Sequence, residues 1–180
     1  MSTNSKITNE FALARLTAQF EGKIISAETP YDLLTVEVPA ADLHDVISWL
    51  KTDDVLRVAY LTNIAGIHYP TQENREFAVV YHLHSLENNF RIRLKAYIPL
   101  ANPTVKTVTD LYAGANWMER ETFDFYGIMF DGHPNLTRIL NEETMDYFPM
   151  RKEYRLEDDT RQDKDNRFLQ LIRYIFYWLK

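Results

Sequence analysis

Two adjacent segments with strand periodicity constrain the fold more than any other feature of the sequence. Residues 77–86 (FAVVYHLHSL) and 90–98 (FRIRLKAYI) are separated only by Glu-Asn-Asn. In the second segment apolar residues alternate with basic or polar ones, and alternate residues lie on opposite faces of a strand. The apolar set is Phe90, Ile92, Leu94, Ala96 and Ile98, and the other set is Arg91, Arg93, Lys95 and Tyr97. We therefore predict an antiparallel hairpin with one buried face and one basic face open to water or a partner.

Helical and strand patterns precede this hairpin. Apolar spacing predicts a helix over residues 8–20, capped by Thr8 or Asn9 and stopped by Gly22, and a second helix over residues 40–51. The second helix has Leu43, Val46, Ile47 and Leu50 on the face expected to pack on the sheet. Short strands are expected over residues 23–27, 33–38 and 55–62, with a loop over 66–75. This order predicts the α+β class, a two-layer sandwich of a mixed or antiparallel sheet with helices on one face.

The pattern changes after the hairpin. Pro103 and Thr104 predict the start of another helical region, with Val105, Val108 and Tyr112 as core contacts, which continues after Gly114 to Tyr126 and ends at Gly127. Beyond Gly127 no period is sustained as far as Asp165. We therefore expect an α+β domain over residues 1–126 and an extended segment over 127–180 that another chain orders.

The last residues have a pattern of their own. Residues 168–180 form a basic amphipathic helix on a helical wheel, and this stretch is shorter than the ~20 residues that span a bilayer. Such a helix can cap the core of its own chain, lie on an anionic surface or enter a groove of a partner. The sequence leaves these three alternatives open.

Composition excludes several classes of function. The chain has no cysteine, so it offers no thiolate ligand for zinc or an iron–sulfur cluster, no disulfide and no cysteine nucleophile. Its net charge of −6 argues against a nucleic-acid partner. No apolar run is long enough for a membrane span, and the N-terminal residues lack a signal-peptide pattern. We expect a cytoplasmic protein that is soluble or peripheral to a membrane.

Chemically versatile residues are densest over residues 117–134. A helix there would place Trp117, Glu121 and Asp124 on one face, and Glu121, Asp124 and His133 could then serve acid–base catalysis. The alternative is a solvated helix face on which Arg120 and Asp124 pair, worth only a few tenths of a kcal/mol. Composition alone favours the second interpretation.

Three histidines offer another candidate site. His82 and His84 lie two apart in a strand pattern, and His68 precedes them, so a three-histidine metal site is conceivable. Their spacing matches no ligand signature, and a polar strand face is the simpler interpretation. The sequence also lacks a phosphate-binding loop and a dinucleotide-binding glycine turn.

One family pattern does match. Residues 119–128 (ERETFDFYGI) are followed by Phe130, Gly132-His133-Pro134, Leu136 and Arg138-Ile139-Leu140. Supporting matches are Tyr81-His82-Leu83 with Ser85, Ala115-Asn116-Trp117 and Arg151-Lys152-Glu153-Tyr154. In this order and spacing the sequence resembles the 30 kDa subunit, also called the C subunit, of the proton-pumping NADH:quinone oxidoreductase, respiratory complex I.

The resemblance implies a non-catalytic subunit of the peripheral arm that helps to assemble the quinone-reducing module. It implies no cofactor in this chain, with flavin and iron–sulfur clusters in partner subunits and quinone as the substrate of the complex. The expected partners are other hydrophilic-arm subunits, above all the quinone-site and iron–sulfur subunits. The expected place is the cytoplasmic side of the plasma membrane, with membrane contact only indirect or through the C-terminal helix.

The motif residues are accordingly expected at partner interfaces rather than in catalysis. The set comprises Glu119, Arg120, Glu121, Asp124, Gly127, His133, Pro134, Arg138, Arg151 and Lys152. One alternative is the same subunit type in a related membrane-bound hydrogenase or another donor-driven complex. The other is a stand-alone acid–base enzyme that uses Glu121, Asp124 and His133.

Overall fold

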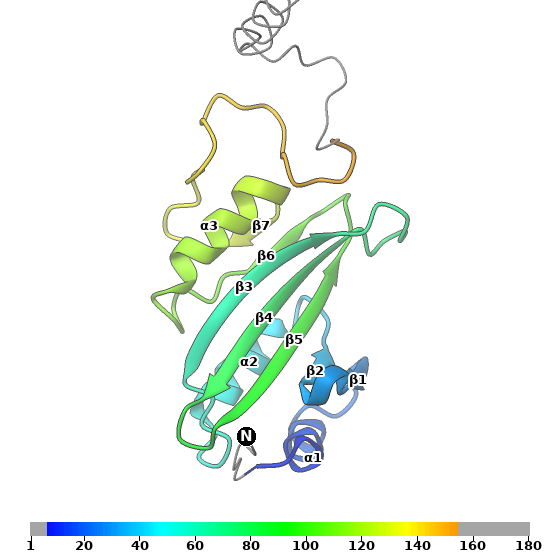
Figure 1. The fold of residues 1–180 in the computed structure, drawn as a ribbon, viewed down its shortest axis with the longest axis vertical. Helices are drawn as coiled ribbons and strands as arrows, with labels where there is room; N and C mark the ends of the chain where they lie inside the picture. The colour runs from blue at the N-terminus through cyan, green and yellow to red at the C-terminus, as the bar shows by residue number, and fades with distance from the viewer. Residues whose placement is uncertain (1–6, 155–180) are drawn as a thin grey trace, which may run out of the picture.

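The predicted hairpin forms the centre of a five-stranded sheet in the computed structural model, which describes residues 7–154 (Figure 1). The sheet has the order β1-β2-β5-β4-β3, and β2 runs parallel to β5 while the other pairs are antiparallel. Its strands are β1 (Ser26–Glu28), β2 (Leu34–Glu37), β3 (Tyr60–His68), β4 (Phe77–Ser85) and β5 (Phe90–Ile98). The helices are α1 (Asn9–Gln19), η1 (Pro30–Asp32), α2 (Leu43–Thr52) and α3 (Ala115–Tyr126). This arrangement confirms the α+β class with a mixed sheet.

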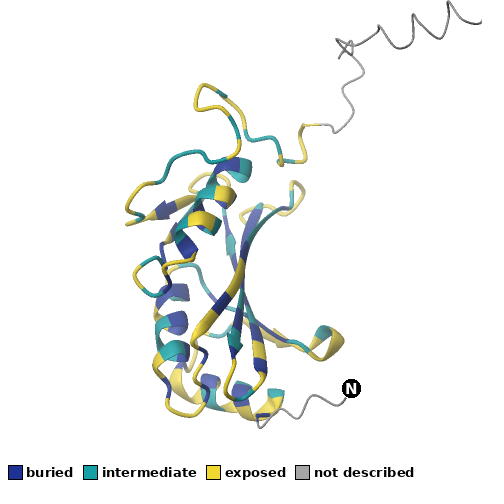
Figure 2. Cartoon of the chain, turned by 60° about the vertical axis from the view of Figure 1, so that its left-hand side comes forward, coloured by how far each residue is buried: buried dark blue, intermediate teal, exposed yellow. Residues whose placement is uncertain are grey.

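The alternation in β5 divides the sheet into two faces as predicted. Each inward residue of β5 is at most 3% exposed, and Leu94 pairs with the buried Tyr81 of β4. Arg91 is exposed and Lys95 is half-buried on the opposite face. Figure 2 shows α2 and α3 on the same side of the sheet, and the predicted apolar face of α2 belongs to the same core as the inward strand residues. Helix α1 begins as predicted, because the Thr8 side chain accepts the Phe11 N–H.

The strand predicted over residues 55–62 begins later than expected. Residues 54–56 form a turn, because the Asp53 carboxylate accepts the N–H groups of Val55 and Leu56 over 3.0 and 2.7 Å. The strand β3 starts at Tyr60 and runs through Gly66, where a loop was expected. A Cβ atom added at Gly66 would lie 2.6 Å from the Tyr126 ring, so this glycine lets α3 pack closely on the strand.

The predicted helix after Pro103 is also wrong at its beginning. Residues Thr104–Lys106 form a short strand, β6, which pairs in parallel with β7 (Met129–Asp131). A helix does not continue from there, because the Val108 N–H donates to the Glu119 side chain instead. The helical structure expected here is confined to α3, and Gly127 caps it as predicted.

The segment after Gly127 starts inside the core. Ile128 and Phe130 are buried in the same apolar cluster as the sheet. From Gly132 onward the described chain has no helix or strand, and Figure 1 shows it arching past the end of α3. The division into residues 1–126 and 127–180 stays a prediction, and the amphipathic helix expected over 168–180 lies outside the described residues.

Candidate functional site

The motif residues 119–140 lie on α3 and on the chain that folds back over its end. Gly127 has a φ of 74°, a left-handed conformation that suits glycine, and its N–H donates to the Phe123 carbonyl over 2.8 Å. A Cβ atom at Gly127 would lie 2.5 Å from the Phe148 ring. The glycine therefore both ends the helix and admits the returning chain.

Asp124 holds the returning chain through both of its carboxylate oxygens. Its Oδ2 accepts the N–H groups of Ile139, Leu140 and Asn141 over 3.0, 2.8 and 2.9 Å. Its Oδ1 accepts from the Arg138 guanidinium over 2.8 Å and from the Asn141 amide over 3.0 Å. Burial opposes the charge, but these hydrogen bonds outweigh it and hold the pKa of Asp124 far below its ordinary value. Asp124 is therefore an ionised anchor without exposed surface.

Three motif arginines donate to backbone carbonyls of this chain. Arg138 donates to the Met145 and Tyr147 carbonyls, Arg120 to those of Thr137 and Arg138, and Arg151 to that of Tyr126, all over 2.7–3.1 Å. The expected pairing of Arg120 with Asp124 is wrong, because Arg138 occupies that carboxylate. We call residues 137–151 the arginine-tied segment.

Glu119 lies on the face of α3 that is turned away from solvent, and it is fully buried. Its carboxyl oxygens lie 2.5 Å from the Thr107 hydroxyl and 2.8 Å from the Val108 nitrogen. Burial raises the pKa of Glu119 to about 7 although both hydrogen bonds lower it. The Tyr81 hydroxyl is buried without a hydrogen-bond partner among the described residues. Glu119 thus fastens the start of α3 to the end of β6 inside this chain.

The three acid–base candidates do not come together. Trp117, Glu121 and Asp124 share one face of α3 as their spacing predicts. Trp117 and Glu121 are exposed there, whereas Asp124 is buried and engaged by the returning chain. His133 accepts the Asn135 N–H at Nδ1, and its Nε2 lies 3.2 Å from the Asn116 carbonyl. A neutral ring with the proton on Nε2 satisfies both contacts. This arrangement fixes a turn and presents no shared proton-transfer site.

The three histidines do not form a metal site. His68 pairs with Phe77 in the register of β3 and β4, and its Nδ1 accepts the Lys152 N–H over 3.0 Å. His82 accepts from the Arg93 Nε over 2.9 Å on the other face of the sheet. Among residues 7–154 no group of three or more potential ligands is placed to hold a metal ion.

Sequence reasoning missed the apolar side chains that surround the arginine-tied segment. Trp117 on α3 is 61% exposed, and the Arg120 guanidinium lies over its ring. Four further large side chains are 39–65% exposed on the returning chain, namely Leu140, Tyr147, Met150 and Tyr154. Exposed apolar groups gathered on one segment are typical of a protein–protein interface. A search for large apolar residues outside regular elements could have found them.

The remaining predicted residues differ in accessibility. Pro134 and Lys152 are exposed, Arg120 and Arg151 are half-buried, and the side chain of Arg138 is only 9% exposed. Within residues 7–154 there is no helix long and apolar enough to cross a membrane.

Comparison with known sequences finds relatives that are all the same kind of respiratory subunit. The family described as respiratory-chain NADH dehydrogenase, 30 Kd subunit, matches residues 36–160. The C subunit of the NADH-quinone oxidoreductase of Roseiflexus castenholzii is 42% identical over 82% of this chain and 84% of the relative. The equivalent subunits of a Nocardioides species and of Mycolicibacterium smegmatis are also 42% identical, and the matches span 49% and 52% of their lengths. The chain thus matches about half the length of some relatives and most of another.

Solved structures agree with the sequence matches. A trypsin-resistant fragment of Nqo5 superposes with a TM-score of 0.61 at 32% identity, over 71% of this chain and 98% of the fragment. A chain of an archaeal membrane-bound sulfane sulfur reductase superposes with a TM-score of 0.69 over 87% of this chain, and its 23% identity indicates a shared fold alone. The matched region contains the hairpin, α3 and the arginine-tied segment, and on these grounds the chain belongs to the family of the 30 kDa subunit of respiratory-chain NADH dehydrogenase.

Proposed function

We propose that this chain is a non-catalytic subunit of the peripheral arm of a proton-translocating NADH:quinone oxidoreductase, where it helps to assemble the quinone-reducing module. Family membership supports the parent enzyme. The enzyme is the complex, and this chain contributes no catalytic residue of its own. Flavin and iron–sulfur clusters belong to partner subunits, quinone is the substrate of the complex, and the chain lies on the cytoplasmic side of the plasma membrane.

This proposal rests on the hydrogen bonds that the charged motif residues form within this chain. Asp124, Arg120 and Arg138 form hydrogen bonds with the backbone of one irregular segment, and Arg151 of that segment donates to the Tyr126 carbonyl at the end of α3. Charges committed in this way hold a surface in one shape and are not themselves free to move protons to a substrate. A fixed surface with exposed apolar side chains suits docking of another subunit.

The ten motif residues then divide into two roles. Glu121, Pro134 and Lys152 are exposed and would touch the partner directly. Glu119, Asp124 and Gly127 are buried and would act only by shaping the surface that the partner meets. His133 and the arginines are half-buried between these extremes. The expected partners are the quinone-site and iron–sulfur subunits.

A second assignment is the same subunit type in another donor-driven complex. It is supported by the fold that this chain shares with a chain of the archaeal sulfane sulfur reductase. The two assignments differ in the electron donor and in the subunits that accompany this chain, not in the role of its surface.

Affinity purification of the tagged full chain from gently solubilised membranes of its source cell tests the proposal. We expect flavin and iron–sulfur subunits to co-purify with NADH:quinone activity. Co-purification with hydrogenase or sulfur-reducing subunits instead would support the second assignment. Recovery of the chain alone, or of the chain with its own stoichiometric flavin or iron, would overturn both.

A matched pair of variants tests the surface itself. Leu140 and Leu86 are 65% and 66% exposed, but only Leu140 belongs to the arginine-tied segment. Because isolated surface substitutions change stability by less than ~0.5 kcal/mol, Leu140→Ser and Leu86→Ser should both fold. We expect Leu140→Ser to lower recovery of the partner subunits and Leu86→Ser to leave it unchanged. Equal recovery with both variants would exclude this segment as the docking surface.

A further inference from the structure

The outward face of the sheet lies on the side opposite α2 and α3 and has a charge unlike that of the rest of the chain. The chain has 26 acidic residues, yet β3, β4 and β5 contain none. Two neighbouring cross-strand rows of this face carry basic groups: Tyr60–His84–Arg91 and Asn63–His82–Arg93. A basic strip on a chain of net charge −6 is a local feature that the overall charge does not explain.

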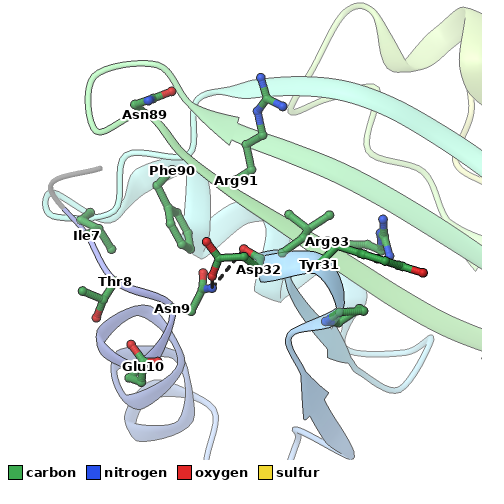
Figure 3. Close-up of a pocket in the computed structure, with 12 residues that line it drawn as sticks. Ile7, Thr8, Asn9, Glu10, Tyr31, Asp32, Asn89, Phe90, Arg91 and Arg93 are labelled. Atoms are coloured by element: carbon green, nitrogen blue, oxygen red, sulfur yellow. Dashed lines mark hydrogen bonds between the residues drawn. The ribbon is translucent and has the colours of Figure 1, made fainter. Parts of the chain in front are cut away.

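Arg91 lies between two hollows on this face. One hollow has a volume of about 710 Å³ and the other of about 500 Å³, and both are lined by Leu33 and Arg91. The smaller one is also lined by Tyr60, His82 and His84 of the outward face. Figure 3 shows the Arg91 side chain pointing away from Asp32, whose carboxylate is held by Asn9 over 3.1 Å. Among the described residues Arg91 has no ion-pair partner.

Two ring nitrogens beside the smaller hollow also lack partners. The Arg93 Nε donates to His82 Nε2, so the neutral His82 ring carries its proton on Nδ1. This Nδ1 and the Nε2 of His84 are buried, and neither has a hydrogen-bond partner among the described residues. Buried polar atoms in proteins are nearly always satisfied, by protein or by a bound group. A carboxylate bound at Arg91 would lie beside His84, which is paired with Arg91 across the two strands.

We propose that this outward face, centred on Arg91, His82 and Arg93, binds an acidic peptide segment of a partner protein. Arg91 and Arg93 offer planar donors that match carboxylates, and Leu33 and Tyr60 beside them can contact an aromatic or aliphatic neighbour. This second surface is separate from the arginine-tied segment, and its binding does not depend on the scaffold role.

Binding to the isolated full chain can be measured by amide chemical shifts in NMR. The probe is a short synthetic peptide of alternating Glu and Tyr, and the control peptide alternates Lys and Tyr. We expect shifts around Arg91 of β5 and His84 of β4 with the acidic probe but not with the control peptide. Binding should weaken as the salt concentration rises. Arg91→Glu should weaken binding at least about tenfold, because it brings like charges together. Lys106→Glu makes the same charge change at an exposed position of β6 and should have no effect.

Photo-cross-linking in the membranes of the source cell names the partner. Benzoylphenylalanine at Tyr60, which is 51% exposed beside this face, should cross-link to a peptide that contains Asp or Glu and belongs to another polypeptide. Cross-links only to lipid or to a peptide without acidic residues would overturn the proposal. Binding of the isolated chain to phosphatidylglycerol vesicles with no response to the acidic probe would also overturn it, and so would equal effects of Arg91→Glu and Lys106→Glu.

Discussion

The Asp124 carboxylate and the Arg138 guanidinium lie 2.8 Å apart, and their side chains are 0% and 9% exposed. The pair joins α3 to the chain that returns past its end, and the same carboxylate accepts three backbone N–H groups there. It therefore acts within this chain, whatever the partner contributes.

Asp124→Ala should destabilise the isolated full chain. Removing the carboxylate leaves Arg138 buried without its counter-charge and three N–H groups without their acceptor, which costs about 3–5 kcal/mol for a buried pair. Urea unfolding measures the loss. Glu121→Ala on the exposed side of the same helix is the control and should change the free energy of unfolding by less than ~0.5 kcal/mol. Equal, small effects of both changes would show that the pair contributes little to the fold.

Glu119→Gln should alter how stability depends on pH. The pKa of Glu119 is about 7 in the folded chain against an ordinary 4.5, so the folded state binds this proton more tightly than the unfolded state does. The stability that this tighter proton binding contributes is complete below the ordinary pKa, and it is lost as the pH rises through about 7. Glutamine keeps the shape and cannot ionise.

The comparison is made by unfolding both proteins at several pH values. Near pH ~4 they should be similarly stable, and near pH ~8 the variant should be more stable by up to about 3 kcal/mol. A constant difference across this range would contradict the burial of an ionisable Glu119.

Local patterns explain which parts of the fold could be predicted. The hairpin and α2 have regular apolar periods that depend only on their own residues. The strand β3 has no such local pattern, because the Asp53 carboxylate fixes residues 54–56 in a turn before it and the Tyr126 ring of a distant helix covers its Gly66. The strand β6 is equally non-local, since its three residues acquire a partner only in β7.

The motif at the candidate site was recognised, but the contacts of its charges were not. Arg120, Arg138 and Arg151 bind backbone carbonyls, and a carbonyl has no residue type that a pattern could reveal. Asp124 likewise binds N–H groups from residue 139 onward. Charge spacing along α3 favoured Arg120 as the partner of Asp124, whereas the actual partner lies beyond the end of the helix.

Gly66→Ala should loosen the contact between β3 and α3. The added Cβ would lie 2.6 Å from the Tyr126 ring and 3.0 Å from the Thr122 methyl group, so the helix or the ring must move. Overpacking of this kind costs about 1–3 kcal/mol, which urea unfolding would detect. Gly114→Ala is the control, because a Cβ there meets nothing within 4 Å and the backbone is already right-handed. Comparable losses in both variants would contradict a close approach at Gly66.

Gly127→Ala and Gly22→Ala together separate backbone strain from packing. The two glycines have φ values of 74° and 75°, so alanine carries the same strain at both, about 1–2 kcal/mol. At Gly22 a Cβ meets nothing within 4 Å, whereas at Gly127 it lies 2.5 Å from the Phe148 ring and 2.6 Å from the Arg151 guanidinium. We therefore expect Gly127→Ala to lower the free energy of unfolding by at least about 1 kcal/mol more than Gly22→Ala does. Since only the Gly127 contact involves the arginine-tied segment, amide exchange should also accelerate there in that variant alone, and equal exchange in both would mean that the segment does not rest on the helix end.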